Sequence, residues 1–192
     1  MDDITKIENF ICCKSQDDWA LNTIQYDWIL EHMDAKWDKK KYRDYIVNFL
    51  LIHFCCRNND LDCIIVTEPD FEKYKHNEKQ ENYLIIMNDG TIQWIRDNYK
   101  TNRTLTALTY NIDDDRFIFS VKEIHKTQKF LFENAEERID RCSIGRVIQN
   151  ATYNKLGQSL YFNIAKKHFK NNPKKLLEIA KSRPVGLRSV VY

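Results

Sequence analysis

The chain has 192 residues, of which 43% are hydrophobic and 30% are charged. This length and composition are typical of one folded domain and are too apolar for intrinsic disorder. No run approaches the ~20 consecutive apolar residues of a membrane-spanning helix, and the acidic start Met1-Asp2-Asp3 is unlike a secretory signal. We therefore expect an intracellular protein, located in the cytoplasm rather than the nucleus, with no membrane partner.

The six cysteines do not form the pattern of a disulfide framework. Two pairs are adjacent, Cys12-Cys13 and Cys55-Cys56, and no paired C-x-x-C spacing of a zinc site is present. Reduced thiols are predicted, with neither a metal site nor a cofactor. His53 close to the second pair leaves zinc binding as the alternative.

Apolar residues at helical spacing predict that three helices form the amino-terminal third. The first covers residues 4–11, and the second has an apolar face that runs from Leu21 to Leu30. The third is expected to begin near Asp38, to end at Asn58-Asn59-Asp60, and to be the central core helix because its apolar surface is wide.

Five short β-rich runs follow, and they predict a central antiparallel β-meander of four to five strands. The runs are residues 63–67, 83–87, 91–95, 104–110 and 116–121. Asn88-Asp89-Gly90 predicts a hairpin, because aspartate and glycine tolerate the positive φ of tight turns. Asp113-Asp114-Asp115 is expected to be a turn before the fifth run, and residues 68–81 a charged connection.

Helical spacing returns in the carboxyl-terminal part. Helices are predicted around residues 130–139, 155–170 and 173–182, the last with a proline in its first turn. Residues 184–192 are expected to form an extended basic tail. The fold class is therefore α+β, with one globular domain over residues 1–183, because helices, sheet and helices follow in blocks rather than alternating.

Charge is segregated along the chain. Residues 151–192 contain nine lysines and arginines and one acidic residue, Glu178. On a helix over residues 155–170, lysines and Phe162 share one face, and such a face can neutralise phosphates while the ring stacks on an unpaired base. The predicted contact residues are Lys155, Phe162, Lys166, Lys167, Lys170, Lys174, Lys175, Arg183, Arg188 and Tyr192.

This basic surface favours a non-enzymatic accessory factor that binds RNA or a ribonucleoprotein, such as the ribosome. One alternative is a protein-interaction or inhibitory factor whose basic face meets an acidic protein. Another is a solvated helix face whose lysines only maintain solubility. A metal-dependent nuclease is the enzyme alternative, for which Asp70 and Glu123-x-x-Lys126 offer carboxylates and a lysine, at a spacing that departs from the expected Glu-x-Lys.

No sequence motif identifies a catalytic residue. Among the tryptophans, Trp37 is expected in a loop between two helices, where it is the best candidate for an exposed aromatic contact. Packing against the core is the favoured role even for this residue.

Overall fold

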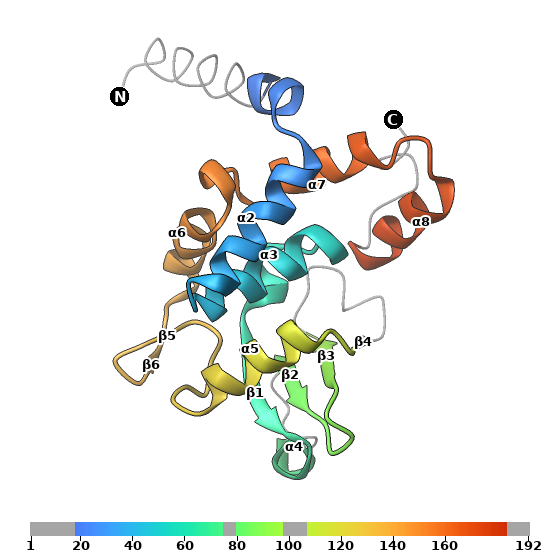
Figure 1. Cartoon of the computed structure of the whole chain (residues 1–192). Helices are drawn as coiled ribbons and strands as arrows, with labels where there is room; N and C mark the ends of the chain where they lie inside the picture. Colours follow the sequence, from blue (N-terminus) through green and yellow to red (C-terminus); the bar gives the residue numbers. More distant parts are fainter. Residues whose placement is uncertain (1–17, 75–79, 98–106, 184–192) are drawn as a thin grey trace, which may run out of the picture.

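The structure of the protein is a computed structural model, and it describes residues 18–74, 80–97 and 107–183 (Figure 1). These residues form the predicted α+β fold. The helices are α2 Tyr26–Asp38, α3 Tyr42–Phe54, α4 Glu68–Tyr74, α5 Asp115–His125, α6 Arg141–Ala151, α7 Gly157–His168 and α8 Pro173–Ser182, with short 3-10 turns η1 Asn58–Leu61 and η2 Tyr153–Lys155. The strands are β1 Cys63–Thr67, β2 Asn82–Ile86, β3 Ile92–Arg96, β4 Leu108–Ile112, β5 Glu133–Asn134 and β6 Glu137–Arg138.

The main sheet has the strand order β1-β2-β3-β4. The predicted antiparallel meander is correct for β2, β3 and β4, but it is wrong for the first pair, because β1 and β2 run parallel. Parallel neighbours need a connection that crosses back over the sheet. Helix α4 begins that connection, so the charged segment 68–81 starts with a helix that was not predicted.

The hairpin predicted at Asn88-Asp89-Gly90 is confirmed between β2 and β3. Gly90 has a φ of 93°, a conformation that side chains with a Cβ rarely adopt. The Asp89 carboxylate accepts a hydrogen bond from the Thr91 N–H at 2.9 Å and closes the turn. The resulting register places Trp94 on the inner face of the sheet, where it is fully buried.

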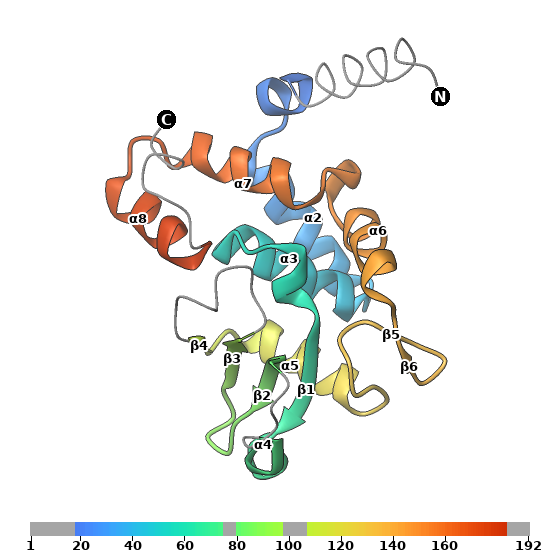
Figure 2. The ribbon, with the colours of Figure 1, turned by 180° about the vertical axis from the view of Figure 1, so that it is seen from behind.

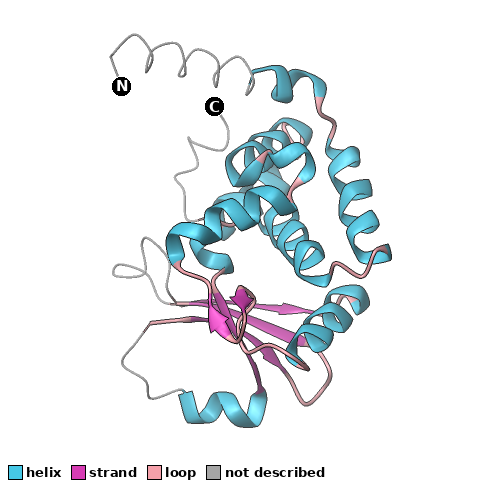
Figure 3. Cartoon of the chain, turned by 90° about the vertical axis from the view of Figure 1, so that its left-hand side faces the viewer, coloured by secondary structure: helices cyan, strands magenta, loops and turns pink. Residues whose placement is uncertain are grey.

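The two faces of the sheet pack against layers of unequal depth, as Figure 3 shows. One face belongs to the main core, in which Trp94 meets Phe54 of α3 with ring centroids 5.4 Å apart. The other face carries a smaller apolar cluster that includes Val66 and Ile85 and packs against Phe71 of α4. The bulk of the helices therefore lies on one side of the sheet.

Helix α3 is the central core helix that was predicted. Every residue from Tyr45 to Ile52 is buried, because α2, α5, α6, α7 and α8 all contact this helix (Figure 2). It begins at Tyr42 rather than near Asp38, because Asp38 still belongs to α2 and Lys40 turns the chain with a φ of 55°. The predicted second helix is likewise divided, since residues 18–23 are helical and α2 starts separately at Tyr26.

The strand predicted at residues 116–121 is wrong, and α5 occupies this segment. The Asp114 carboxylate accepts a hydrogen bond from the Phe117 N–H at 2.8 Å, so one of the three aspartates expected to form a turn caps a helix instead. Phe117, Val121 and Ile124 then lie on one buried helical face, while Phe119 is 46% exposed. Apolar residues at alternate positions also fit the period of a strand, and this ambiguity caused the error.

The helix predicted around residues 130–139 is also wrong. Phe130 forms an isolated antiparallel bridge with Ile64 of β1, so this apolar segment covers the outer edge of the strand. The small hairpin β5–β6 follows, and its turn residues Ala135 and Glu136 both have positive φ. Helical structure resumes only at α6, which was not predicted.

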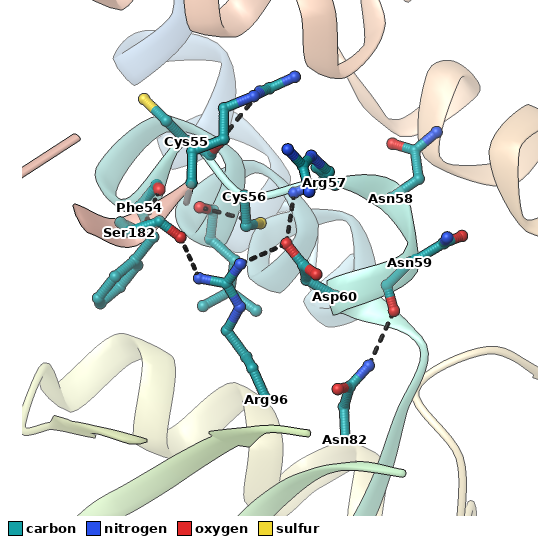
Figure 4. Close-up of polar contacts among 12 residues, drawn as sticks. Phe54, Cys55, Cys56, Arg57, Asn58, Asn59, Asp60, Asn82, Arg96 and Ser182 are labelled. Atoms are coloured by element: carbon teal, nitrogen blue, oxygen red, sulfur yellow. Dashed lines mark hydrogen bonds and ion pairs between the residues drawn. The ribbon is translucent and has the colours of Figure 1, made fainter. Parts of the chain in front are cut away.

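A buried ion pair fastens the end of α8 to the sheet (Figure 4). The Arg96 guanidinium at the end of β3 lies 2.5 Å from the Asp60 carboxylate of η1, and both side chains are 1% exposed. The same guanidinium donates a hydrogen bond to the Ser182 carbonyl at 2.5 Å and lies 5.0 Å from the centroid of the Trp94 ring. One arginine thus joins the sheet, the turn after α3 and the last residue of α8.

Two further contacts hold the end of α8 against the end of α3 (Figure 4). The Ser182 hydroxyl donates a hydrogen bond to the Phe54 carbonyl. The Arg183 guanidinium donates one to the Cys55 carbonyl at 3.1 Å. The carboxyl-terminal helices are therefore fixed to the core by specific polar contacts as well as by apolar packing.

Candidate nucleic-acid interface

Helix α7 carries the first half of the basic carboxyl-terminal region. Its apolar residues recur at helical spacing and are buried against the core. These residues are Leu160, Tyr161, Ile164 and Ala165. The helix begins at Gly157, directly after Asn154 and Lys155, which both have positive φ. The prediction of one continuous helix from Lys155 is therefore wrong, and Lys155 lies in the turn η2 rather than on the face that carries Phe162.

Helix α8 has the bounds that were predicted, residues 173–182. The Asn172 side chain accepts a hydrogen bond from the Lys175 N–H at 3.1 Å and caps the helix. Pro173 occupies the first helical position, where a missing N–H loses no intrahelical bond. The buried Leu176 and Ile179 orient the helix so that its basic side chains point away from the core.

The solvent side of α7 and α8 is strongly cationic. Residues 156–183 contain seven lysines and arginines and one acidic residue, Glu178. The exposed cations are Lys167, Lys170, Lys174 and Lys181, and the half-buried ones are Lys166, Lys175 and Arg183. We call these seven side chains the α7–α8 basic surface.

Some of these cations are already engaged. The Lys167 ammonium donates a hydrogen bond to the Leu21 carbonyl at 2.6 Å, and the Lys175 ammonium lies 3.1 Å from the Glu178 carboxylate. Three side chains make no hydrogen bond or ion pair with the part of the chain that the structure describes: Lys170, Lys174 and Lys181. Their positive charges are thus available to an anionic partner.

Phe162 is enclosed by cations of its own surface. Its half-buried ring lies 4.3 Å from the centre of the Arg183 guanidinium and 5.7 Å from the Lys166 ammonium, which are cation–π distances. Burial, followed by the charge of the nearby Arg57, lowers the pKa of Arg183. A base that stacks on the face covered by Arg183 must displace this arginine, so this face of Phe162 is better suited to positioning the arginine than to binding a base.

A cavity of about 340 Å³ lies where the end of α7 meets the start of α2. Lys167, His168 and Lys170 line one side of it, and Tyr26 and Asp27 the other. His168 is exposed, and its ring stacks on Tyr26 with a centroid distance of 4.3 Å. The basic surface therefore extends to the amino-terminal end of α2.

Two predicted contact residues, Arg188 and Tyr192, lie outside the described residues. The predicted set did not include a second basic run, Lys39-Lys40-Lys41-Tyr42-Arg43, which covers the turn after α2 and the first two residues of α3. Its signal is visible in the sequence, because consecutive lysines next to an aromatic residue and an arginine are typical of a nucleic-acid contact.

The side chains considered for metal-dependent cleavage occupy separate elements. Asp70 lies in the first turn of α4, where it pairs with Lys73 at 2.7 Å and accepts a hydrogen bond from the Thr67 hydroxyl at 2.9 Å. Both hydrogen bonds lower the pKa of Asp70, and the bond from Lys73 has the larger effect. Glu123 of α5 pairs with Lys126, which directly follows the helix. Among the described residues, no three histidine, cysteine or carboxylate side chains are grouped to hold a metal ion.

No protein-family model, curated protein or solved structure matches this chain. Within residues 18–74, 80–97 and 107–183, no helix has the length and apolar character needed to cross a bilayer. A functional proposal therefore depends on the chemistry of the surface itself.

Proposed function

We propose that the protein is a non-enzymatic accessory factor that binds RNA or a ribonucleoprotein, such as the ribosome, through the α7–α8 basic surface. The observation that carries this proposal is the set of exposed lysines on α7, on α8 and on the turn between them, with Glu178 as the one acidic residue between residues 156 and 183. Closely spaced cations of this kind match the repeating charge of a phosphate backbone.

The proposed contact is electrostatic. Lys170, Lys174 and Lys181 neutralise phosphates and release the counterions that the nucleic acid holds, which provides affinity without reading sequence. Phe162 and Arg183 support this surface from within, because their cation–π contact joins α7 to the end of α8. The exposed lysines therefore provide the affinity for RNA, and Phe162 with Arg183 holds the two helices in position.

Charge reversal tests this assignment directly. We expect Lys170→Glu combined with Lys174→Glu to lower the affinity for a labelled RNA hairpin at least tenfold, measured by fluorescence anisotropy. If about three lysines contact phosphates of a duplex, the plot of log affinity against log salt has a slope of about −3. In the double variant the magnitude of this slope decreases by about 2, because two of the three contacts are lost. The control is Lys73→Glu with Lys129→Glu, which makes the same charge change on the α4 side of the sheet.

Equal affinity and salt dependence of the wild type and the α7–α8 variant would overturn the proposal. Purification from the native cell with and without ribonuclease distinguishes the acidic-protein alternative. A partner that stays bound after ribonuclease treatment, and is lost in the double variant, would assign the surface to a protein instead of RNA.

A further inference from the structure

The corner formed by α2, α3 and α5 presents an exposed aromatic ring. Phe119 of α5 is 46% exposed. The rings of Trp37 and Tyr42 meet it at 64° and 71°, with centroid distances of 6.4 and 5.6 Å. Trp37 was expected in a loop, but it lies in the last turn of α2 and is half-buried. Phe119 is thus held by two aromatic neighbours while nearly half of its side chain remains open to solvent.

Four cations at this corner lack an acidic or hydrogen-bonding partner among the described residues. The side chains of Lys39, Lys40, Lys41 and Arg43 make no hydrogen bond or ion pair with any described residue. Three of them, Lys40, Lys41 and Arg43, line a cavity of about 520 Å³ between the start of α3 and the end of α5. Arg43 Nε is buried and lacks an acceptor among the described atoms, and such a donor gains from an incoming oxygen.

Three of the acidic residues nearby are already paired. Asp44 pairs with Lys36 at 2.9 Å, and Glu123 pairs with Lys126. Asp34 pairs with Arg116 at 3.0 Å, and that guanidinium lies over the Trp37 ring. Asp38 and Asp115 of these elements make no ion pair with a described residue, but the four cations at residues 39–43 outnumber them, so the corner keeps an excess of positive charge.

We propose that Lys40, Lys41, Arg43 and Phe119 form a second RNA contact, specific for single strands, in which Phe119 stacks on an unpaired base and the cations hold its phosphates. Base stacking on aromatic side chains beside a cationic groove is how proteins bind single strands without reading sequence. This inference rests on the proposed function, since both surfaces bind one RNA. The two surfaces lie at opposite ends of α3 (Figures 1 and 2).

Substitutions at Phe119 separate stacking from charge. We expect Phe119→Leu, which keeps an apolar side chain without a ring, to lower the affinity for a labelled oligouridylate of about 15 nucleotides roughly five- to tenfold. The affinity of this variant for a blunt-ended RNA duplex, in which every base is paired, stays unchanged. Phe119→Trp retains a ring and keeps the wild-type affinity for both probes, and thermal unfolding of each variant verifies the fold.

Neutral substitutions test the cations. With Lys40→Gln and Lys41→Gln, the salt slope for the oligouridylate decreases in magnitude by about 1.4, because each single-strand phosphate contact contributes about 0.7. If these variants and Phe119→Leu bind the oligouridylate like the wild type, the second contact is overturned. In that case the loss caused by Lys170→Glu with Lys174→Glu still decides the α7–α8 proposal independently.

Two other outcomes would also reject this inference. An equal loss of affinity for the single strand and for the blunt-ended duplex in Phe119→Leu would exclude stacking on an unpaired base. Competition by polyglutamate that matches competition by unlabelled oligouridylate would show that the corner binds acidic chains in general and does not select RNA.

Discussion

Arg96 is a single residue that joins segments 36 and 86 positions away along the chain, through Asp60 and Ser182. A buried guanidinium is costly unless it is paired and hydrogen-bonded. The Asp60 carboxylate supplies the negative charge that balances the guanidinium. The Ser182 carbonyl at the end of α8 accepts a hydrogen bond from another N–H group of Arg96. The buried ion pair therefore helps to fix the end of the carboxyl-terminal helix against the sheet.

Asp60→Asn is expected to lower the free energy of unfolding by about 3–5 kcal/mol, because the neutral amide leaves the Arg96 charge buried without a counterion. Urea unfolding followed by circular dichroism measures this loss. Glu178→Gln is the matched control, since it removes the carboxylate of the more exposed pair with Lys175 and should leave the unfolding midpoint nearly unchanged. A loss below about 1 kcal/mol in Asp60→Asn would contradict the role assigned to the pair.

His53 makes the stability depend on pH. Burial, followed by the charge of Lys175 and opposed by Asp114, lowers the pKa of His53 from its usual 6.5. Because the folded pKa is the lower one, the unfolded chain takes up the proton first, and stability present above about pH 6.5 is lost as the pH falls. We expect His53→Gln to lose less stability than the wild type between about pH 7.5 and pH 5.5, measured by urea unfolding at each pH. His32, whose pKa is also lowered, is unchanged in both proteins, so equal losses would exclude His53 as the source.

The elements that could be predicted from the sequence are those with local signals. Strand β1 and helix α8 have the predicted bounds. A run of β-branched residues favours the strand, and Asn172-Pro173 favours the start of the helix, and both signals depend only on residues that are adjacent in the sequence. The parallel pairing of β1 with β2 depends on a partner beyond α4, so no local pattern shows it. The exposed lysines of α7 and α8 follow from helical spacing, whereas the contact of Arg183 with Phe162 requires the docking of α8.

Helix α5 depends on its amino-terminal cap. The Asp114 carboxylate accepts one hydrogen bond from the Phe117 N–H and another from the Tyr45 hydroxyl at 3.4 Å. We expect Asp114→Ala to reduce the free energy of unfolding by about 1–2 kcal/mol, measured by urea unfolding. Asp113→Ala is the control, because Asp113 makes no side-chain hydrogen bond with the described residues, and it should leave stability unchanged. Equal effects of the two substitutions would show that net charge, not capping, decides the result.

At the scale of the whole molecule, the protein combines a near-neutral net charge with strong local polarity. The net charge is +2, yet two cationic surfaces stand at the two ends of α3. With 13 residues, α3 is about 20 Å long. A linear polyanion that follows the surface between these ends can therefore contact both.

The length of RNA needed for tight binding tests whether both surfaces bind one strand. At about 3.4 Å per nucleotide, a stacked strand needs about six nucleotides to cover the length of α3 and several more to fill each contact. We expect the affinity for oligouridylates to rise steeply up to about 10–12 nucleotides and then to level off, because the second contact becomes intramolecular once the strand reaches it. In Lys170→Glu with Lys174→Glu this length dependence disappears, since only the Phe119 corner remains. If strands of about five nucleotides bind the wild type as tightly as longer ones, the two surfaces act separately and the RNA does not bridge them.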